Sequence, residues 1–175
     1  MNVAQSISQW LVDQEITHAF GVVGGGNVAI WEAIARLGKT TLVSVHHEQA
    51  AAQAATYYFR ACGRLALCLC TTGAGSANAL TGVIAAYMDS IPLLVISGNE
   101  PARLWASSDE RVLGTQGYRS AELVRPVVKW SHTMMPSEAN VREILDNGWG
   151  VATGGRPGPV WLDFPKDVQL LLCAG

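Results

Sequence analysis

The sequence predicts a doubly wound α/β domain, with a mostly parallel six-stranded sheet and helices on both faces. Two observations support this prediction. Short apolar runs alternate along the chain with longer segments of helical spacing, and runs such as IPLLVISG show no polar alternation. Strands that are apolar on both faces need helices on both sides of the sheet, as in a parallel α/β fold.

The expected elements follow one another along the whole chain. Helical spacing occurs at 4–14, 27–38, 48–63, 76–90 and 136–153, and strand-like runs at 16–23, 40–45, 64–70, 91–98, 127–132 and 159–164. Gly38 ends the second helix, and Pro136 with Ser137 begins the last one. Residues 100–125 lose this rhythm and gain charge, which is typical of a functional loop. We expect a single domain over residues 1–175, without internal repeats.

The composition argues against several classes of function. Of the 175 residues, 49% are hydrophobic and 15% are charged, which is enough apolar surface for one sizeable core. The formal net charge is -2 and no basic stripe is present, so we expect no nucleic-acid partner and no binding to an anionic membrane. No segment reaches the length of a membrane span and the first residues lack a signal-peptide pattern, which predicts a cytoplasmic protein.

The four cysteines are Cys62, Cys68, Cys70 and Cys173, and none belongs to a C-x-x-C pair. Cys68 and Cys70 are two residues apart in a strand-like run, which places them on one face of the expected strand. We interpret all four as small buried apolar residues, and not as metal ligands or disulfide partners.

The turns that follow the strands are the first places to look for a site, because ligands bind beyond the carboxyl ends of parallel strands. These turns read GVVGGGN, HHE and TTGAGSAN. Gly24, Gly26 and Ala29 satisfy G-x-G-x-x-A, and Glu48 lies about where a ribose-binding carboxylate would follow. A dinucleotide-binding domain is therefore one alternative, although a helix precedes this strand and a tight turn also explains the glycines.

His46, His47 and Glu48 do not have the spacing of a zinc site. An H-E-x-x-H helix would need a second histidine four residues after the first, where this chain has Ala50 and Ala51. A carboxylate at the start of a helix also has a structural explanation, since the helix dipole favours a negative charge there. We predict no metal ligand in this chain.

Three longer segments resemble a known family. VHHEQAAAQAATYYFRA, CTTGAGSANALTGVIAAYMDSIPLLVISGNEP and GRPGPVWLDFPKDVQ are similar, in order and spacing, to the pyrimidine-binding domain of thiamine-diphosphate enzymes of the acetolactate synthase group. The resemblance extends from about AFGVVGG to FPKDV. It implies thiamine diphosphate as the cofactor, a 2-oxo acid as the donor substrate and a carbonyl compound as a possible acceptor.

The resemblance also implies roles for single residues. Glu48 takes the place of the cofactor-activating glutamate, whose hydrogen bond to N1′ of the aminopyrimidine favours the imino tautomer that removes the C2 proton of the thiazolium. Cofactor-binding positions are implied at Val22, Val23, Gly24, Gly25, Thr71, Thr72, Gly73 and Asn78. For Asn78, a helix cap or a structural hydrogen bond is an alternative.

The sequence lacks the other half of the cofactor site that this family uses. Its members hold the diphosphate through magnesium bound to a G-D-G motif in a separate domain, and no GDG occurs here. The resemblance therefore implies a split enzyme, in which a partner chain is the diphosphate subunit and holds Mg²⁺. The expected assembly is an α2β2 heterotetramer. A non-catalytic subunit that stabilises or regulates its partner, and a fragment of a longer synthase, are the alternatives.

The substrate prediction depends on the loop at 100–125. Relatives that make acetolactate carry phenylalanine, glutamine and glutamate where this chain has Tyr118, Arg119 and Ser120. Gln116 could replace the missing glutamine only if the loop shifted, and Arg119 could bind an anionic substrate group or simply be solvated. His47 is a third candidate for substrate contact. These departures favour a specialised biosynthetic reaction over branched-chain amino acid synthesis, and leave both substrates open.

Overall fold

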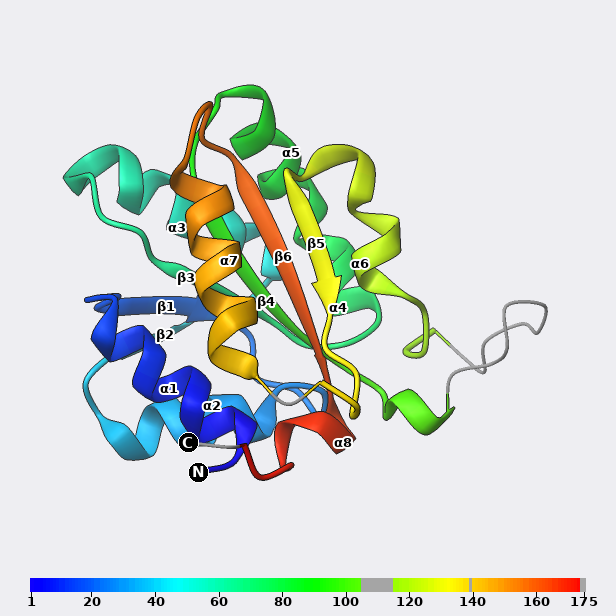
Figure 1. Ribbon diagram of the computed structural model, residues 1–175. Coiled ribbons are helices and arrows are strands. Elements are labelled where there is room, and N and C mark those ends of the chain that lie inside the picture. The colour runs from blue at the N-terminus through cyan, green and yellow to red at the C-terminus, as the bar shows by residue number, and fades with distance from the viewer. Residues whose placement is uncertain (105–114, 139, 174–175) are drawn as a thin grey trace.

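The structure is a computed structural model that describes residues 1–104, 115–138 and 140–173. Its strands are β1 (His18–Gly21), β2 (Thr41–Ser44), β3 (Leu67–Cys70), β4 (Leu93–Asn99), β5 (Trp130–Thr133) and β6 (Pro159–Pro165). They form one six-stranded sheet in the order β2-β1-β3-β4-β6-β5, and every neighbouring pair is parallel (Figure 1). The predicted fold class is confirmed.

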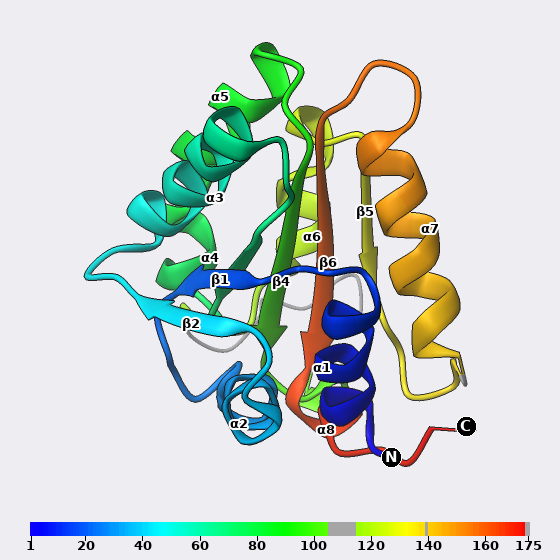
Figure 2. The same cartoon turned by 90° about the vertical axis from the view of Figure 1, so that its left-hand side faces the viewer.

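Helices cover both faces of this sheet (Figure 2). One face carries α1 (Val3–Asp13), α2 (Val28–Leu37), α7 (Val141–Thr153) and the short α8 (Lys166–Gln169). The other carries α3 (Glu48–Cys62), α4 (Ala74–Asn78), α5 (Leu80–Met88) and α6 (Ser120–Leu123), and 3₁₀ turns occur at Ala102–Leu104 and Arg125–Val127. Within the described parts of the chain, no helix combines the length and the apolarity that crossing a membrane requires.

Each face of the sheet buries its own apolar cluster. Trp10, Ile30 and Leu145 belong to the cluster under α1, α2 and α7, and Ala52 and Trp161 to the cluster under α3 and α5. The central strands β3, β4 and β6 are buried along their whole length, as their apolar runs predict. The edge strand β2 differs, because Thr41 and Ser44 are exposed, and for this strand the expectation of two buried faces is wrong.

Local capping signals explain several helix ends. Gly38 ends α2 with φ of 65°, as predicted, because glycine adopts the left-handed conformation without a Cβ clash. The last long helix begins at Val141 and not at Pro136, so that prediction is wrong. Asn140 sets the start, since its side chain accepts a hydrogen bond from Glu143 N at 3.2 Å.

Two further expectations need correction. The helix predicted at 76–90 is divided at Ala79 into α4 and α5. Cys68 and Cys70 are buried on one face of β3 with their Sγ atoms 3.7 Å apart, as expected, whereas Cys62 is exposed in the last turn of α3. All four cysteines are free, and Cys173 is half-buried.

Gly98 on β4 lies directly against the loop that follows β1. A Cβ at this position would lie 1.9 Å from the carbonyl oxygen of Gly26. We predict that Gly98→Ala lowers the free energy of unfolding by about 3 kcal/mol, because strand and loop would have to separate. Urea unfolding measures this change.

The matched control is Gly150→Ala in the interior of α7, where a Cβ would meet nothing within 4 Å. Alanine is the better helix former, so this variant should gain roughly 0.5–1 kcal/mol. Equal effects of the two substitutions would show that the contact between Gly98 and Gly26 does not constrain the fold.

Candidate functional site

The candidate site lies at the carboxyl ends of β1 and β3, where the winding of the sheet reverses. From β1 the chain moves outward to β2, and it then returns to β3 on the other side of β1. The connecting segments therefore leave the sheet on opposite faces, and this switch point is the position where doubly wound sheets bind ligands. The three turns singled out in the sequence all lie at this edge.

Glu48 is the acidic group at this edge of the sheet. It is the first residue of α3 and is only 7% exposed. Its Oε2 accepts a hydrogen bond from Asn78 Nδ2 at 3.1 Å. Among the described residues, the structure records no hydrogen bond to Oε1, the atom that lies nearest to Gly75. One oxygen of a nearly buried carboxylate is thus fixed, while the other can accept a hydrogen bond from a ligand.

The glycine loop after β1 packs tightly on the turn after β3. A Cβ at Gly24 would lie 2.4 Å from Thr71 Oγ1, and one at Gly26 would lie 2.8 Å from Thr72 N. Gly26 N donates to Thr71 Oγ1 at 3.2 Å. A Cβ at Gly75 would lie 2.6 Å from the Thr71 methyl group. These glycines therefore allow two turns to touch, which accounts for them without a dinucleotide.

Gly25 and Gly73 have different surroundings. A Cβ at Gly25 would meet only Lys166 Nζ, at 3.9 Å, and the neighbouring Val23 is exposed. Gly73 has φ of 68°, a conformation that favours glycine, and its carbonyl group turns toward Tyr118. The glycine loop thus keeps an open outer side at Gly25, beside Lys166 of α8.

Asn27 and Gln169 hold the glycine loop, and sequence reasoning missed both. Asn27 is fully buried, and its Oδ1 accepts from Gly24 N at 2.9 Å while its Nδ2 donates to Val22 O at 3.0 Å. Gln169 Nε2 donates to Gly26 O at 2.6 Å. An asparagine directly after three glycines was a usable turn signal. Gln169 gave none, because its partner is 143 positions away.

Each of the three residues predicted to contact the substrate has a hydrogen bond or an ion pair within the protein. His47 is exposed and caps α3, with Nδ1 accepting from Gln49 N at 3.2 Å. The carbonyl oxygen of Gln116 accepts from Thr72 Oγ1, which keeps this residue near Gly73. Arg119 pairs with Glu122 at 2.9 Å. Their roles stay predictions, and residues 105–114 of the predicted loop lie outside the described residues.

Asp163 is a buried acid that sequence reasoning did not consider. It lies on β6 with no exposed surface, and it accepts hydrogen bonds from Ser97 Oγ at 2.5 Å and from Asn99 Nδ2 at 2.8 Å. Desolvation raises the pKa of Asp163, and the hydrogen bonds from Asn99 and Ser97 oppose this effect in part. A single aspartate inside the apolar run PVWLDF was the available signal.

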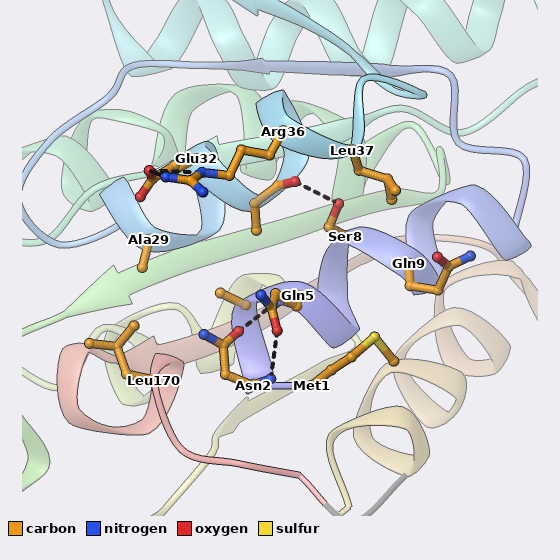
Figure 3. Close-up of a pocket in the computed structure, with 12 residues that line it drawn as sticks. Met1, Asn2, Gln5, Ser8, Gln9, Ala29, Glu32, Arg36, Leu37 and Leu170 are labelled. Atoms are coloured by element: carbon orange, nitrogen blue, oxygen red, sulfur yellow. Dashed lines mark hydrogen bonds and ion pairs between the residues drawn. The ribbon is translucent and has the colours of Figure 1, made fainter.

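A cavity of about 460 Å³ opens on the other side of the molecule, between α1 and α2 (Figure 3). Its polar groups already have partners in the protein. Ser8 Oγ donates to Ala33 O at 3.1 Å, and Arg36 pairs with Glu32 at 2.6 Å. None of the predicted site residues lines it. We therefore place the candidate site at Glu48. In the described part of the chain, no three His, Cys, Asp or Glu side chains gather as metal ligands.

Fold and site together define an α/β domain in which a nearly buried glutamate, held by Asn78, lies at the carboxyl edge of the sheet next to its switch point. Residues 1–123 match the sequence profile described as "Thiamine pyrophosphate enzyme, N-terminal TPP binding domain". The chain belongs to this family, and the resemblance identified from its motifs is confirmed.

Several acetolactate synthases are similar to this chain over most of its length. The large subunit from Buchnera aphidicola is 36% identical over 168 residues, which cover 94% of this chain and 28% of the relative. The isozyme 3 large subunit from Escherichia coli is 38% identical over the same shares of each chain. The chloroplastic enzyme from Arabidopsis thaliana is 32% identical over 95% of this chain and 24% of its own length. The chain thus spans about a quarter of these relatives.

The raised pKa of Asp163 predicts how stability depends on pH. The folded chain holds this proton more tightly than the unfolded chain, in which the carboxyl group has its ordinary pKa of 3.8. The protonated form therefore contributes stability at low pH that is lost as the pH rises through the folded pKa. Because asparagine does not titrate, the unfolding free energy of Asp163→Asn minus that of the wild type should increase from pH 4 toward pH 7. Urea unfolding at several pH values measures this difference, and a constant difference would contradict the assignment.

Proposed function

We propose that this chain is the pyrimidine-binding half of a thiamine-diphosphate-dependent 2-oxo acid decarboxylase or carboligase of the acetolactate synthase type. The observation that carries this proposal is the state of Glu48. Its carboxylate is nearly buried, Asn78 holds one oxygen, and the other oxygen has no hydrogen-bond partner among the described residues. A general acid or base needs a group placed in this way within reach of a ligand proton.

We propose that an aminopyrimidine ring binds against Glu48. Such a ring needs a carboxylate for N1′, and the oxygen of Glu48 that has no hydrogen-bond partner among the described residues meets this need. Glu48 Oε1 would share the proton at N1′, while Asn78 keeps Oε2 in place. The buried Ala51 and Ala52 exclude water behind the carboxylate. Thiamine diphosphate, when bound, supplies the electron sink for decarboxylation of a 2-oxo acid.

The diphosphate half of the site is proposed to come from another subunit that holds Mg²⁺, in an α2β2 heterotetramer. The 175 residues given contain no GDG motif, so the residues proposed to hold Mg²⁺ lie outside them. The length of the relatives favours a second candidate, in which the same half belongs to one longer chain. Glu48 has the same role in both. The cytoplasmic location and the identities of the 2-oxo acid donor and the carbonyl acceptor stay predictions.

The outer side of α3 and α5 is the surface on which we propose that the diphosphate half docks. Large apolar side chains are exposed there, namely Tyr57, Ile84, Tyr87 and Met88. Tyr57 and Met88 have 62% and 64% of their surface exposed. Arg60 on α3 and Asp89 after α5 form an ion pair of 2.5 Å across the two helices. Glu48 is the first residue of α3, so a partner bound to this surface would cover Glu48 and bury the exposed apolar side chains of α3 and α5.

Glu48→Gln tests the catalytic assignment. Glutamine keeps the size of the side chain and can still pair with Asn78, but it cannot take up or release the proton at Oε1. We predict a folded chain that still assembles, with turnover of a 2-oxo acid reduced about 10²- to 10⁴-fold in the assembled enzyme.

Glu32→Gln is the matched control, since it makes the same chemical change on an exposed residue of α2. This variant should retain the wild-type rate. Wild-type turnover in Glu48→Gln would refute the role of Glu48. Full activity of the diphosphate half alone would instead identify this chain as a non-catalytic subunit.

Tyr57→Asp tests the docking surface. A charge in the centre of an apolar interface should weaken association with the diphosphate half about 30-fold, whereas the isolated chain should keep its stability because the side chain is exposed. Sedimentation velocity of the mixed subunits measures this association. Leu172→Asp is the control, because Leu172 is 86% exposed and follows α8 on the other face. Unchanged assembly of the Tyr57 variant would exclude this surface.

A further inference from the structure

A buried polar network connects β6 with the residues that form the candidate site. Its centre is Asn99, the last residue of β4, which is 1% exposed. Asn99 Nδ2 donates to Asp163 Oδ2 at 2.8 Å and to Tyr118 O at 3.1 Å. Asn99 Oδ1 accepts from Glu100 N at 2.8 Å and lies 3.3 Å from Thr72 Oγ1. The nitrogen and the oxygen of this amide thus both have hydrogen-bond partners.

The carboxylate of Asp163 reinforces the orientation of this amide that the backbone groups Glu100 N and Tyr118 O also require. An ionised carboxylate only accepts hydrogen bonds, so the NH₂ group of Asn99 must face Asp163 and the oxygen must face the opposite way. This orientation sends the second N–H of Asn99 to the carbonyl group of Tyr118. A neutral amide at position 163 would leave Asn99 Nδ2 without an acceptor if it presented its NH₂ group, and would accept a weaker hydrogen bond than the carboxylate if it presented its oxygen.

Tyr118 passes this constraint on to the site. Its hydroxyl group donates to Gly73 O at 2.8 Å, in the turn after β3. Burial raises the pKa of the Tyr118 hydroxyl, which keeps the group protonated and able to donate. The same turn leads into α4, which ends at Asn78, the residue that holds Glu48. A continuous chain of hydrogen bonds and short backbone segments therefore joins the buried carboxylate to the catalytic one.

The fold itself does not require a charge at position 163. Burial of a carboxylate costs free energy, and a neutral group of similar shape is usually tolerated as well or better. Ser97 and Trp161 already complete the hydrogen bonds on the other side of Asp163, with Trp161 Nε1 donating to Ser97 Oγ at 2.8 Å. The specific consequence of the charge is therefore a stronger hydrogen bond to Asn99, which holds this residue more tightly.

We propose that Asp163 is a positioning residue for the bound pyrimidine ring, acting through Asn99 on Tyr118, which holds the turn that leads to Asn78 and Glu48. The identity of the ligand rests on the proposed function. The network itself lies within this chain and is testable without a partner or a cofactor.

Hydrogen exchange of the full chain, followed by mass spectrometry, is the first test. In Asp163→Asn we expect the backbone amides of residues 115–121 and 71–78 to exchange at least about 10-fold faster. Asn99 loses its hydrogen bond to a carboxylate in this variant and therefore holds Tyr118 O less tightly. Ser97→Ala is the matched control. It removes one hydrogen bond of Asp163, together with the 3.5 Å contact between Ser97 Oγ and Ser120 Oγ, and leaves Asn99 in place, so residues 71–78 and 115–119 should exchange within about 2-fold of the wild type.

The exchanged pair Asn99→Asp with Asp163→Asn separates positioning from stability. It restores a buried carboxylate next to an amide, but an aspartate at position 99 cannot donate to Tyr118 O. We expect the thermal stability of Asp163→Asn or better, with fast exchange at 115–121. Slow exchange at 115–121 in Asp163→Asn would overturn the proposal. Acceleration that is spread over the whole sheet, and that is equal in Ser97→Ala, would also overturn it.

Kinetics of the assembled enzyme are the second test. Asp163→Asn should raise the KM for thiamine diphosphate about 10-fold and change kcat by less than about 3-fold, whereas Ser97→Ala should change neither. An unchanged KM in Asp163→Asn would show that the network does not act on the ligand. If the wild-type assembly shows no thiamine-dependent turnover, the proposed function fails, and hydrogen exchange still decides whether Asp163 positions the turn.

Discussion

The contact between the glycine loop after β1 and the turn after β3 is the constraint on which the candidate site depends. Gly24 and Gly26 touch Thr71 and Thr72 at distances that leave no room for a side chain. Gly98 supports the loop from β4 in the same way. The turn after β3 leads into α4, where Gly75 lies against both Thr71 and Glu48 and where Asn78 donates to the carboxylate of Glu48. Packing around the turn after β3 thus helps to fix the position of the Glu48 carboxylate.

Two carboxylates in this region have contrasting environments. Glu48 is 7% exposed, and one of its oxygens has no hydrogen-bond partner among the described residues. Asp163 has no exposed surface, and both of its oxygens accept hydrogen bonds. A group that exchanges protons with a ligand must be reachable, whereas a group that orients its neighbours must be enclosed. This contrast is the basis for assigning catalysis to Glu48 and positioning to Asp163.

The fold could be predicted from the sequence to a greater extent than the site. Alternating apolar runs were sufficient for the parallel sheet, and Gly38 marked the end of α2, because these signals are local. The start of α7 was misplaced because Asn140 competes with Pro136 and Ser137 as a cap. Glu48 alone was ambiguous between a helix-dipole partner and a catalytic acid, and only the resemblance of longer segments separated them. Asp163 and Asn99 are 64 positions apart, so no local pattern revealed their contact.

The most direct test of the central claim is the rate at which enzyme-bound thiamine diphosphate exchanges its C2 proton with deuterated solvent, compared between the wild-type assembly and Glu48→Gln. This rate reports proton removal from the cofactor and does not depend on the identity of either substrate. If Glu48 activates the cofactor, exchange should be at least about 100-fold slower in the variant, with the cofactor still bound. Equal exchange rates in the two proteins would contradict the account.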